Sequence, residues 1–359
     1  METGALSLGA MAPPLQADLA RLADDARLFA QKIDLGRMAL LFVHLEEGDY
    51  RAASFLDDRI LSGSVRGFWA PLQQAAQALG PSPRLRPLHF IFHAGHVGST
   101  LVSRLLDEID GVLPVREPLT LRSLAEAHDA VGTAASLLSP QQFEGLTRLN
   151  VHLWARGFDT TQAVILKATS SAARMGPALM EVAAQARALY LYLKPEPYLA
   201  ALLSGENTPT DLRGMGPERA RRFEALTGAP PPPLHTLSLG GLAALTWASE
   251  RLTQARLAAN VGPRLLEVDF DALLAKPGAH MVRIADHFRL NPGVDYATHV
   301  TDSPMWGRYS KAIDHAYSPD LRAQVLAETR ALHGASIADG LRLLDALGAR
   351  HEALGKLLS

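Results

Sequence analysis

The sequence predicts an α/β protein whose parallel sheet is covered by helices on both faces, and three observations lead to this prediction. Short apolar runs alternate with helical patterns from residue 88 onward, which is the order of repeated strand–helix–strand units. The apolar runs are continuous, as in strands that are buried on both faces. A turn with two glycines joins the first run to the first helical pattern, as at the ligand-binding edge of such sheets.

Each element of this three-layer domain follows from its own pattern. The strands are expected at residues 88–92, 112–115, 163–166, 188–193 and 264–268. The helices between them are expected at residues 99–108, 119–128, 140–156, 172–185 and 239–260. Residues 321–358 are predicted to form two packing helices with no evident chemistry.

Residues 1–82 are predicted to form a mainly helical N-terminal region, and residues 83–359 the α/β domain. Apolar residues recur at near-helical spacing between residues 14 and 32, and three prolines between residues 81 and 87 mark a stiff boundary. Three roles are open for the N-terminal region: packing on the main domain, covering its site, or making a homodimer contact.

Residues 205–236 interrupt the alternation and are predicted to be a flexible insertion. The stretch contains a basic cluster at Arg219, Arg221 and Arg222 and four consecutive prolines. A solvated surface loop is the preferred interpretation, and a mobile lid over the substrate is the alternative.

Composition limits the class of protein. The chain has 359 residues, enough for a sizeable core, and 35 Lys and Arg against 37 Asp and Glu predict no nucleic-acid partner. The absence of cysteine excludes disulfides, thiolate ligands and cysteine nucleophiles. No apolar run is long enough for a membrane span, and the N-terminus lacks the pattern of a signal peptide. A cytoplasmic protein without a membrane partner is expected.

The turn after the first strand has the strongest functional pattern. Its glycines allow a sharp turn that gathers several backbone N–H groups, and its two hydroxyl residues begin a helix whose first N–H groups have no internal partner. This arrangement predicts a pocket for phosphate or sulfate. An ordinary turn with glycines for close packing is the alternative. The residues of the turn are Gly95, His96, Val97, Gly98, Ser99 and Thr100.

The stretch GHVGSTL at residues 95–101 resembles the phosphosulfate-binding loop of the sulfotransferase family, in which Gly-Thr-Thr is followed by Trp or Leu. The resemblance implies a P-loop-type domain that transfers a sulfuryl group from 3′-phosphoadenosine 5′-phosphosulfate to a hydroxyl or amine of a small-molecule acceptor. It implies that Gly95, Val97, Gly98, Ser99 and Thr100 bind this co-substrate. His96 replaces the usual Lys or Arg, so activity is expected to fall as the pH rises through the pKa of this histidine.

Charged residues that end the next two predicted strands complete the expected active site. Because the carboxyl ends of parallel strands share one edge, Glu117 and Lys167 should face the loop. Glu117 is the predicted proton acceptor, Arg116 would orient it or bind an anionic acceptor, and Lys167 would stabilise the transferring group. The family's catalytic histidine, two residues after this Lys, is replaced by Thr169. A surface Arg–Glu pair and a snorkelling Lys are the structural alternatives.

The resemblance also implies a site for the 3′-phosphate and adenine of the nucleotide. Residues 190–199 resemble the strand and turn of that site, although Leu193 and Ala201 stand where the family has Arg and Ser. The predicted contacts are a Lys one place after Leu193, a Ser about one helical turn after Ala201, and two basic residues in a basic and aromatic loop near the C-terminal end. These residues are Lys194, Ser204, Arg308 and Lys311.

No metal is expected, because His93 and His96 lack a neighbouring cluster of carboxylates. Two other functions stay open. A kinase-type phosphotransferase would require a loop Lys, which is absent, and an acidic residue that holds magnesium, for which Asp269 is the candidate. The preferred roles are structural: Asp269 ends a strand and Asp271 caps a helix. The departures from the family pattern also allow a degenerate member that binds a ligand or partner without turnover.

Overall fold

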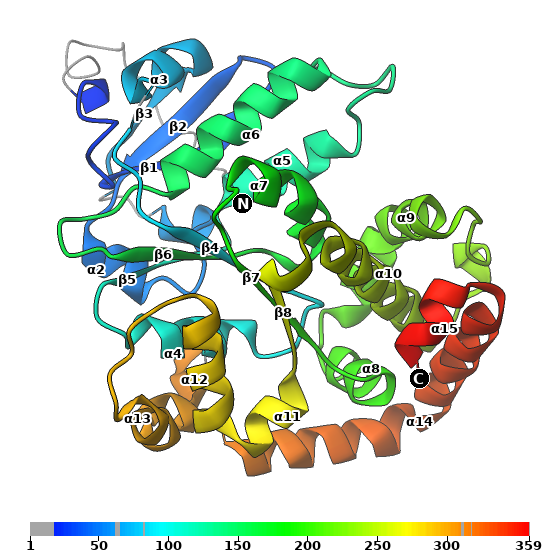
Figure 1. The fold of residues 1–359 in the computed structure, drawn as a ribbon. Helices are drawn as coiled ribbons and strands as arrows, with labels where there is room; N and C mark the ends of the chain where they lie inside the picture. Colours follow the sequence, from blue (N-terminus) through cyan, green and yellow to red (C-terminus); the bar gives the residue numbers. More distant parts are fainter. Residues whose placement is uncertain (1–17, 62–64, 82, 310–311, 317, 359) are drawn as a thin grey trace, which may run out of the picture.

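A five-stranded parallel sheet forms the centre of the computed structural model, which describes residues 18–61, 65–81, 83–309, 312–316 and 318–358 (Figure 1). The strand order is β5-β6-β4-β7-β8, so the first strand of the sheet in sequence lies in the middle. Phe90 of β4 is in register with Leu166 of β6 on one side and with Ala188 of β7 on the other. The strands are β4 Leu88–His93, β5 Val112–Arg116, β6 Ala163–Lys167, β7 Ala188–Tyr192 and β8 Leu265–Asp269.

Helices cover both faces of this sheet. On one face α4 (Ser99–Asp107) lies beside α12 (Pro277–His287), and on the other α7 (Gly176–Val182) lies beside α10 (Leu239–Val261). All six residues of β4 are buried, which explains its continuous apolar sequence. The predicted fold class is confirmed, and each predicted strand and helix from residue 88 to residue 260 is found within a few residues. The other helices of this domain are α5 Leu119–His128, α6 Pro140–Trp154, α8 Pro195–Leu203, α11 Phe270–Ala275 and α13 Tyr296–Asp302, with the short turn η2 Ser170–Met175 before α7.

The N-terminal region is built on an antiparallel sheet, in the order β1-β2-β3. The mainly helical prediction is wrong for the described part of this region. Its apolar spacing came from residues in different elements: Leu19 lies in a short helical stretch and Leu22 in the turn after it, whereas Phe29 lies in β1 and packs edge-on against Tyr50. The elements are β1 Leu28–Asp34, β2 Ala39–His44, β3 Gly67–Pro71, α2 Glu47–Ala52, the turn η1 Asp58–Ile60 and α3 Leu72–Leu79.

This sheet shares its core with the rest of the protein. Phe29, Leu41 and Val43 belong to the same buried cluster as the residues of the parallel sheet. On the other face of the small sheet, Phe42 packs in a cluster that includes Leu149 of α6. Of the three roles left open for the region, packing on the main domain is therefore confirmed.

The insertion at residues 205–236 contains a long helix, α9 (Thr208–Thr227), so the prediction of a loop is wrong. Leu212 and Phe223 are fully buried, and α9 packs along α10. The helix ends at Gly228, whose φ of 77° closes the last turn. Tertiary burial of two apolar residues outweighs the polar composition that suggested a loop.

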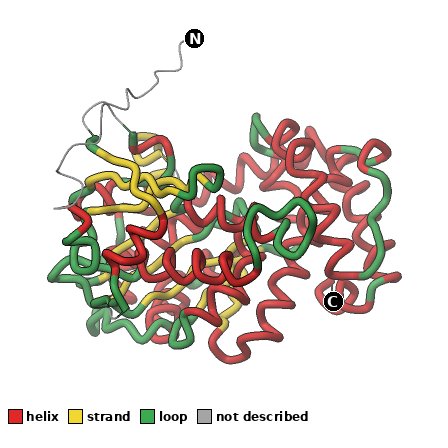
Figure 2. Tube along the Cα trace, turned by 90° about the horizontal axis from the view of Figure 1, so that it is seen from above, coloured by secondary structure: helices red, strands yellow, loops and turns green. Residues whose placement is uncertain are grey.

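Two helices at the C-terminus pack on α8 and α10, as predicted. They are α14 (Pro319–Arg350), which is kinked at His333, and α15 (Glu352–Leu358). A short hairpin of β9 (Arg308–Tyr309) and β10 (Ala312–Ala316) precedes them. Seen from above, the antiparallel strands and the C-terminal helices lie at opposite ends of the molecule (Figure 2). None of the helices in the described ranges is both long and apolar enough to cross a bilayer.

Candidate functional site

The glycine loop between β4 and α4 has the backbone geometry of an anion cradle. Gly95, His96 and Gly98 all have positive φ angles, of 87°, 54° and 66°. Turns that contain left-handed residues can direct successive backbone N–H groups into one concavity. Gly98 is the N-cap of α4, so the unpaired N–H groups of that helix add to the same concavity.

A buried hydroxyl in this loop has no partner. Thr100 is 1% exposed, and its Oγ1 makes no hydrogen bond with any residue that the structure describes. Buried polar atoms in native proteins are nearly always hydrogen-bonded, so an unpaired one requires an explanation. Thr100 lies in the first turn of α4, two residues after Gly98, so this unpaired hydroxyl belongs to the candidate loop.

Three side chains outside the loop hold it in place. His93 accepts a hydrogen bond at Nδ1 from the Gly95 N–H (3.1 Å), so its Nε2 carries the proton and donates to the Ala168 carbonyl (2.8 Å). The Tyr198 hydroxyl donates to the Ala94 carbonyl (2.8 Å). The ring of Phe270 lies against Gly98, where a Cβ would come within 2.0 Å of Cζ. The sequence analysis missed the last two contacts, because both residues are distant from the loop in sequence.

Glu117 and Lys167 meet at the carboxyl ends of β5 and β6. Lys167 is fully buried, and its ammonium forms an ion pair with the Glu117 carboxylate. The Thr169 hydroxyl donates to Oε2 of the same carboxylate (3.2 Å). Glu117 has a φ of 51°, a strained conformation for a residue with a Cβ and one that is typical of functional sites. The predicted pair is thus brought together, with Thr169 bound to it.

The N-terminal region also reaches this pair, which the sequence analysis did not foresee. The Leu56 N–H donates to the Arg116 carbonyl (2.6 Å), at the end of β5. The ring of Phe55 lies 5.6 Å from the Lys167 ammonium, and the Arg59 guanidinium lies 3.6 Å from the same ring. The segment from residue 55 to residue 59 therefore covers one side of the Glu117–Lys167 pair.

The Arg116 guanidinium is occupied inside the protein, which argues against the substrate-binding role predicted for it. The side chain is fully buried, and burial lowers its pKa to about 10. Its guanidinium donates to Ser103 in α4, to Asp107 (2.8 Å) and to the carbonyls of residues 50, 51 and 53. Because side chains alternate along a strand, Arg116 points into the interior, where it ties the N-terminal region to the sheet.

Of the residues expected at the far end of the nucleotide, Lys194 and Ser204 lie at opposite ends of α8. Leu193 is buried, and its carbonyl accepts from the Trp247 indole. Lys194 is exposed at the start of α8, and Ser204 follows the end of that helix, about 15 Å away at the rise of an α-helix. The Ser204 hydroxyl donates to the Ala201 carbonyl (2.9 Å). Arg308 lies in β9, where only its backbone is described, and Lys311 lies outside the described residues.

A cavity of about 750 Å³ opens beside the loop. His96 is exposed and lines it, together with Thr169 and Ser170, which follow β6. Tyr198 of α8 and Arg219 of α9 line other parts of the wall. The cavity therefore lies at the carboxyl edge of the sheet, where parallel α/β proteins bind ligands.

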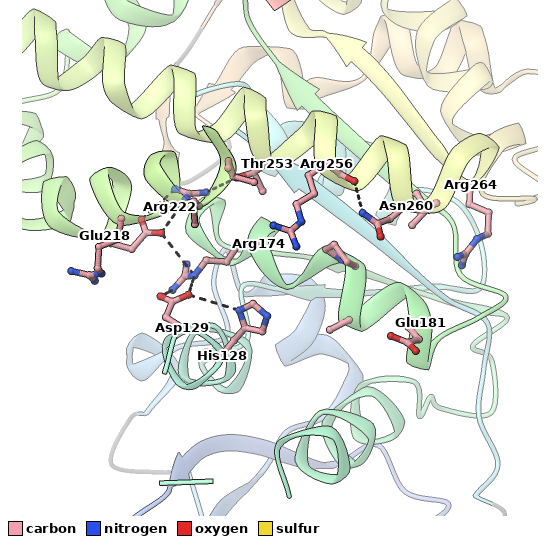
Figure 3. A pocket seen from close by; sticks show the side chains of 16 residues that line it. His128, Asp129, Arg174, Glu181, Glu218, Arg222, Thr253, Arg256, Asn260 and Arg264 are labelled. Carbon is pink, nitrogen blue, oxygen red and sulfur yellow. Dashed lines mark hydrogen bonds and ion pairs between the residues drawn. The ribbon is translucent and has the colours of Figure 1, made fainter. Parts of the chain in front are cut away.

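A second cavity of about 730 Å³ lies on the other side of an ion-pair network (Figure 3). Arg174 holds Asp129 with two hydrogen bonds, of 2.8 and 3.0 Å, and lies 3.9 Å from Glu218 of α9. Arg222 joins Glu218 (2.9 Å) to the buried Glu250 of α10 (2.7 Å). The network fastens α9 to η2 and α10, so α9 is an anchored wall of both cavities.

Asp269 has the structural role expected for it and more. It ends β8 and also caps α11, where its Oδ1 accepts from the Ala272 N–H (3.0 Å). Asp271, the expected cap, instead pairs with Arg322 of α14 (2.8 Å). Within the described ranges, no group of three or more His, Asp or Glu residues has the arrangement of a metal site.

Comparisons with known proteins add structural likeness only. No protein-family model matches the chain, and no curated protein matches it in sequence. Among solved structures, the chain is similar to the sulfotransferase domain from the curacin biosynthetic pathway, with 14% identity over 74% of this chain and 98% of that chain and a TM-score of 0.39. It is also similar to the sulfotransferase domain from the Synechococcus PCC 7002 olefin synthase, with 16% identity over 75% of this chain and 97% of that chain and a TM-score of 0.42. The likeness to sulfotransferase STF9 from Mycobacterium avium has 14% identity over 88% of this chain and 96% of that chain, with a TM-score of 0.37. At these TM-scores, the likeness decides nothing about the chemistry of this chain.

Proposed function

We propose that this protein transfers a sulfuryl group from 3′-phosphoadenosine 5′-phosphosulfate to a hydroxyl or amine of a small-molecule acceptor. One juxtaposition supports the proposal. The glycine loop, with the unpartnered Thr100 hydroxyl, follows β4, and the Glu117–Lys167 pair ends the strands β5 and β6 at the same edge of the sheet. The loop offers hydrogen-bond donors to an anionic ester, and the pair offers one proton acceptor and one cation.

The residues have distinct roles in this reaction. Glu117 takes the proton from the acceptor hydroxyl as its oxygen bonds to sulfur. The bond from sulfur to the bridging oxygen of the donor breaks at the same time, and the phosphate that leaves keeps the electron pair. Lys167 stabilises the negative charge on the transferring group, and His96 donates a hydrogen bond to the leaving oxygen. Thr169 holds the carboxylate of Glu117 in position.

The chain's residues fit the two ends of the donor unequally. The 5′-phosphosulfate matches the loop, because the Thr100 hydroxyl has no partner among the described residues and the first N–H groups of α4 have none within the helix. For the 3′-phosphate, the described residues offer the exposed Lys194 at the start of α8. We propose Ser204, Arg308 and Lys311 as the remaining contacts of the nucleotide.

A thermal-shift measurement with three conditions tests the proposal: adenosine 3′,5′-bisphosphate, ATP with magnesium, and neither. A ligand at about one hundred times its Kd stabilises the folded protein by about 2.7 kcal/mol. We expect this shift with the bisphosphate. A shift with ATP and magnesium alone would instead support a kinase-type phosphotransferase, and no shift with either would support a member without turnover.

A variant at the unpaired hydroxyl makes the test specific to the loop. Thr100→Val keeps the shape of the side chain and removes a buried hydroxyl that has no partner, so the protein without ligand should be at least as stable as the wild type. The shift produced by the bisphosphate should become smaller. Thr100→Ser keeps the hydroxyl and should retain the shift, whereas equal shifts in all three proteins would place the nucleotide elsewhere.

A further inference from the structure

The cavity beside the glycine loop has the size of a small-molecule site. Its volume of about 750 Å³ lies within the range of pockets that enclose drug-sized ligands. Thr169, which is hydrogen-bonded to Glu117, lines one part of it, and α9 lines another. A molecule that fills the cavity therefore contacts both the neighbourhood of Glu117 and the face of α9.

Arg219 of α9 has a donor that stays unpaired within the described part of the chain. The residue is 8% exposed and lines the cavity. Its Nη2 donates to Asp211 (3.1 Å), but its Nη1 is buried and makes no hydrogen bond with any described residue. An unpaired donor on a buried charged group is costly, so an acceptor atom from a ligand would be well placed there.

The other charges of the cavity wall are paired within the protein or exposed to solvent, as the side chains of Arg122, Glu126 and Arg221 are. Asp129 is held by Arg174 with two hydrogen bonds, and Glu218 is paired with Arg222. Four Arg and four acidic side chains line the cavity, so net charge favours neither sign. The unfilled Nη1 of Arg219 is therefore the feature that selects the chemistry of the ligand.

We infer that the cavity takes an acceptor that bears a carboxylate, with an oxygen of that carboxylate bound to Nη1 of Arg219. This inference rests on the proposed function, because it places the hydroxyl or amine of the same molecule near Glu117. A cavity of this volume spans about 11 Å if it is compact, which limits the separation of the two groups to about that length. Arg219 belongs to the basic cluster of the sequence and acts as a specificity residue of the acceptor site.

The test uses matched pairs of small molecules. The probes are para-hydroxybenzoate, para-hydroxyphenylacetate and para-hydroxyphenylpropanoate, each beside its primary amide, with binding measured by calorimetry. At least one acid should bind the wild-type protein ten times or more as tightly as its amide. Arg219→Gln should erase that preference and Arg219→Lys should restore part of it, because a Lys supplies charge without the planar fork. Arg213→Gln removes an exposed charge from the same helix and should change nothing.

The result separates this inference from the function on which it rests. Each variant is first compared with the wild type by circular dichroism and by its shift with adenosine 3′,5′-bisphosphate, which Arg219→Gln should leave intact. If the acids and amides bind alike, if none of the acids binds, or if Arg219→Gln keeps the preference, the inference is overturned even when the bisphosphate binds. If the acids bind through Arg219 and the bisphosphate does not bind, the inferred carboxylate site stands and the proposed sulfuryl transfer is wrong.

Discussion

Replacing Gly98 by Ala should deform the anion cradle, and the structure gives the size of the effect. The φ of 66° costs a residue with a Cβ about 1–2 kcal/mol. The added Cβ would also lie 2.0 and 2.1 Å from two atoms of the buried Phe270 ring, so the ring or the loop must move. Overpacking of this kind costs about 1–3 kcal/mol more.

Gly228 is a matched control for this substitution. Its φ of 77° and ψ of 5° place it in the same left-handed region as Gly98, and a Cβ there would meet no atom within 4 Å. An unfolding entropy of about 2.1 cal/mol/K per residue, spread over 359 residues, makes each kcal/mol worth about 1.3 °C in Tm. By these figures, Gly228→Ala should lower Tm by about 1–3 °C and Gly98→Ala by about 3–7 °C.

Differential scanning fluorimetry measures both variants with and without adenosine 3′,5′-bisphosphate. Gly98→Ala should also reduce the shift that the bisphosphate produces, whereas Gly228→Ala should leave that shift unchanged. Equal losses of Tm in the two variants would show that the Phe270 ring does not restrict the loop. The inference that Phe270, which follows β8 and begins α11, holds the glycine loop in its shape would then be refuted.

Three further predictions concern single side chains. Arg116→Met should lower the free energy of unfolding by about 3–5 kcal/mol, because it leaves a carboxylate and three carbonyls without their buried donor. Arg148→Met, which breaks an exposed ion pair on a helix, should lower it by less than about 1 kcal/mol. Thermal melts that show equal losses in the two variants would contradict the structural role of Arg116. Burial lowers the pKa of His89 to about 4, so as the pH falls the imidazole takes up a proton in the unfolded chain before it does so in the folded protein. The stability advantage of the wild type over His89→Gln should therefore shrink by up to about 3 kcal/mol as the pH falls from 7 to 4. Urea titrations at several pH values measure this difference in unfolding free energy, and His235→Gln, at an exposed histidine, is the control. A difference that does not change with pH would be inconsistent with a buried neutral imidazole at His89. Glu117→Gln should lower kcat for sulfuryl transfer at least a hundredfold while the Kd of the bisphosphate stays within twofold, and an unchanged kcat would remove Glu117 from the proton transfer.

The sequence by itself determined the parallel sheet and its edge. Continuous apolar runs identify strands that are buried on both faces, because such strands have no solvent side on which polar residues would alternate. The two glycines and the hydroxyls after residue 88 located the loop, since a sharp turn into a helix needs those residue types locally. The shared edge of parallel strands then predicted that Glu117 and Lys167 lie together.

Tertiary structure decided everything that depends on which distant segment lies opposite. Arg116 and Glu117 are neighbours in sequence, yet one is buried under the N-terminal region and the other lies at the edge of the site, because the strand ends between them. The contacts of Phe55 with Lys167 and of Phe270 with Gly98 join residues that are more than one hundred positions apart. Residues 208–227 fold as a helix because α10 buries their few apolar side chains, which places Arg219 in the cavity wall. Local patterns report on the conformation of a segment, whereas burial and pairing depend on partners that only the folded chain brings together.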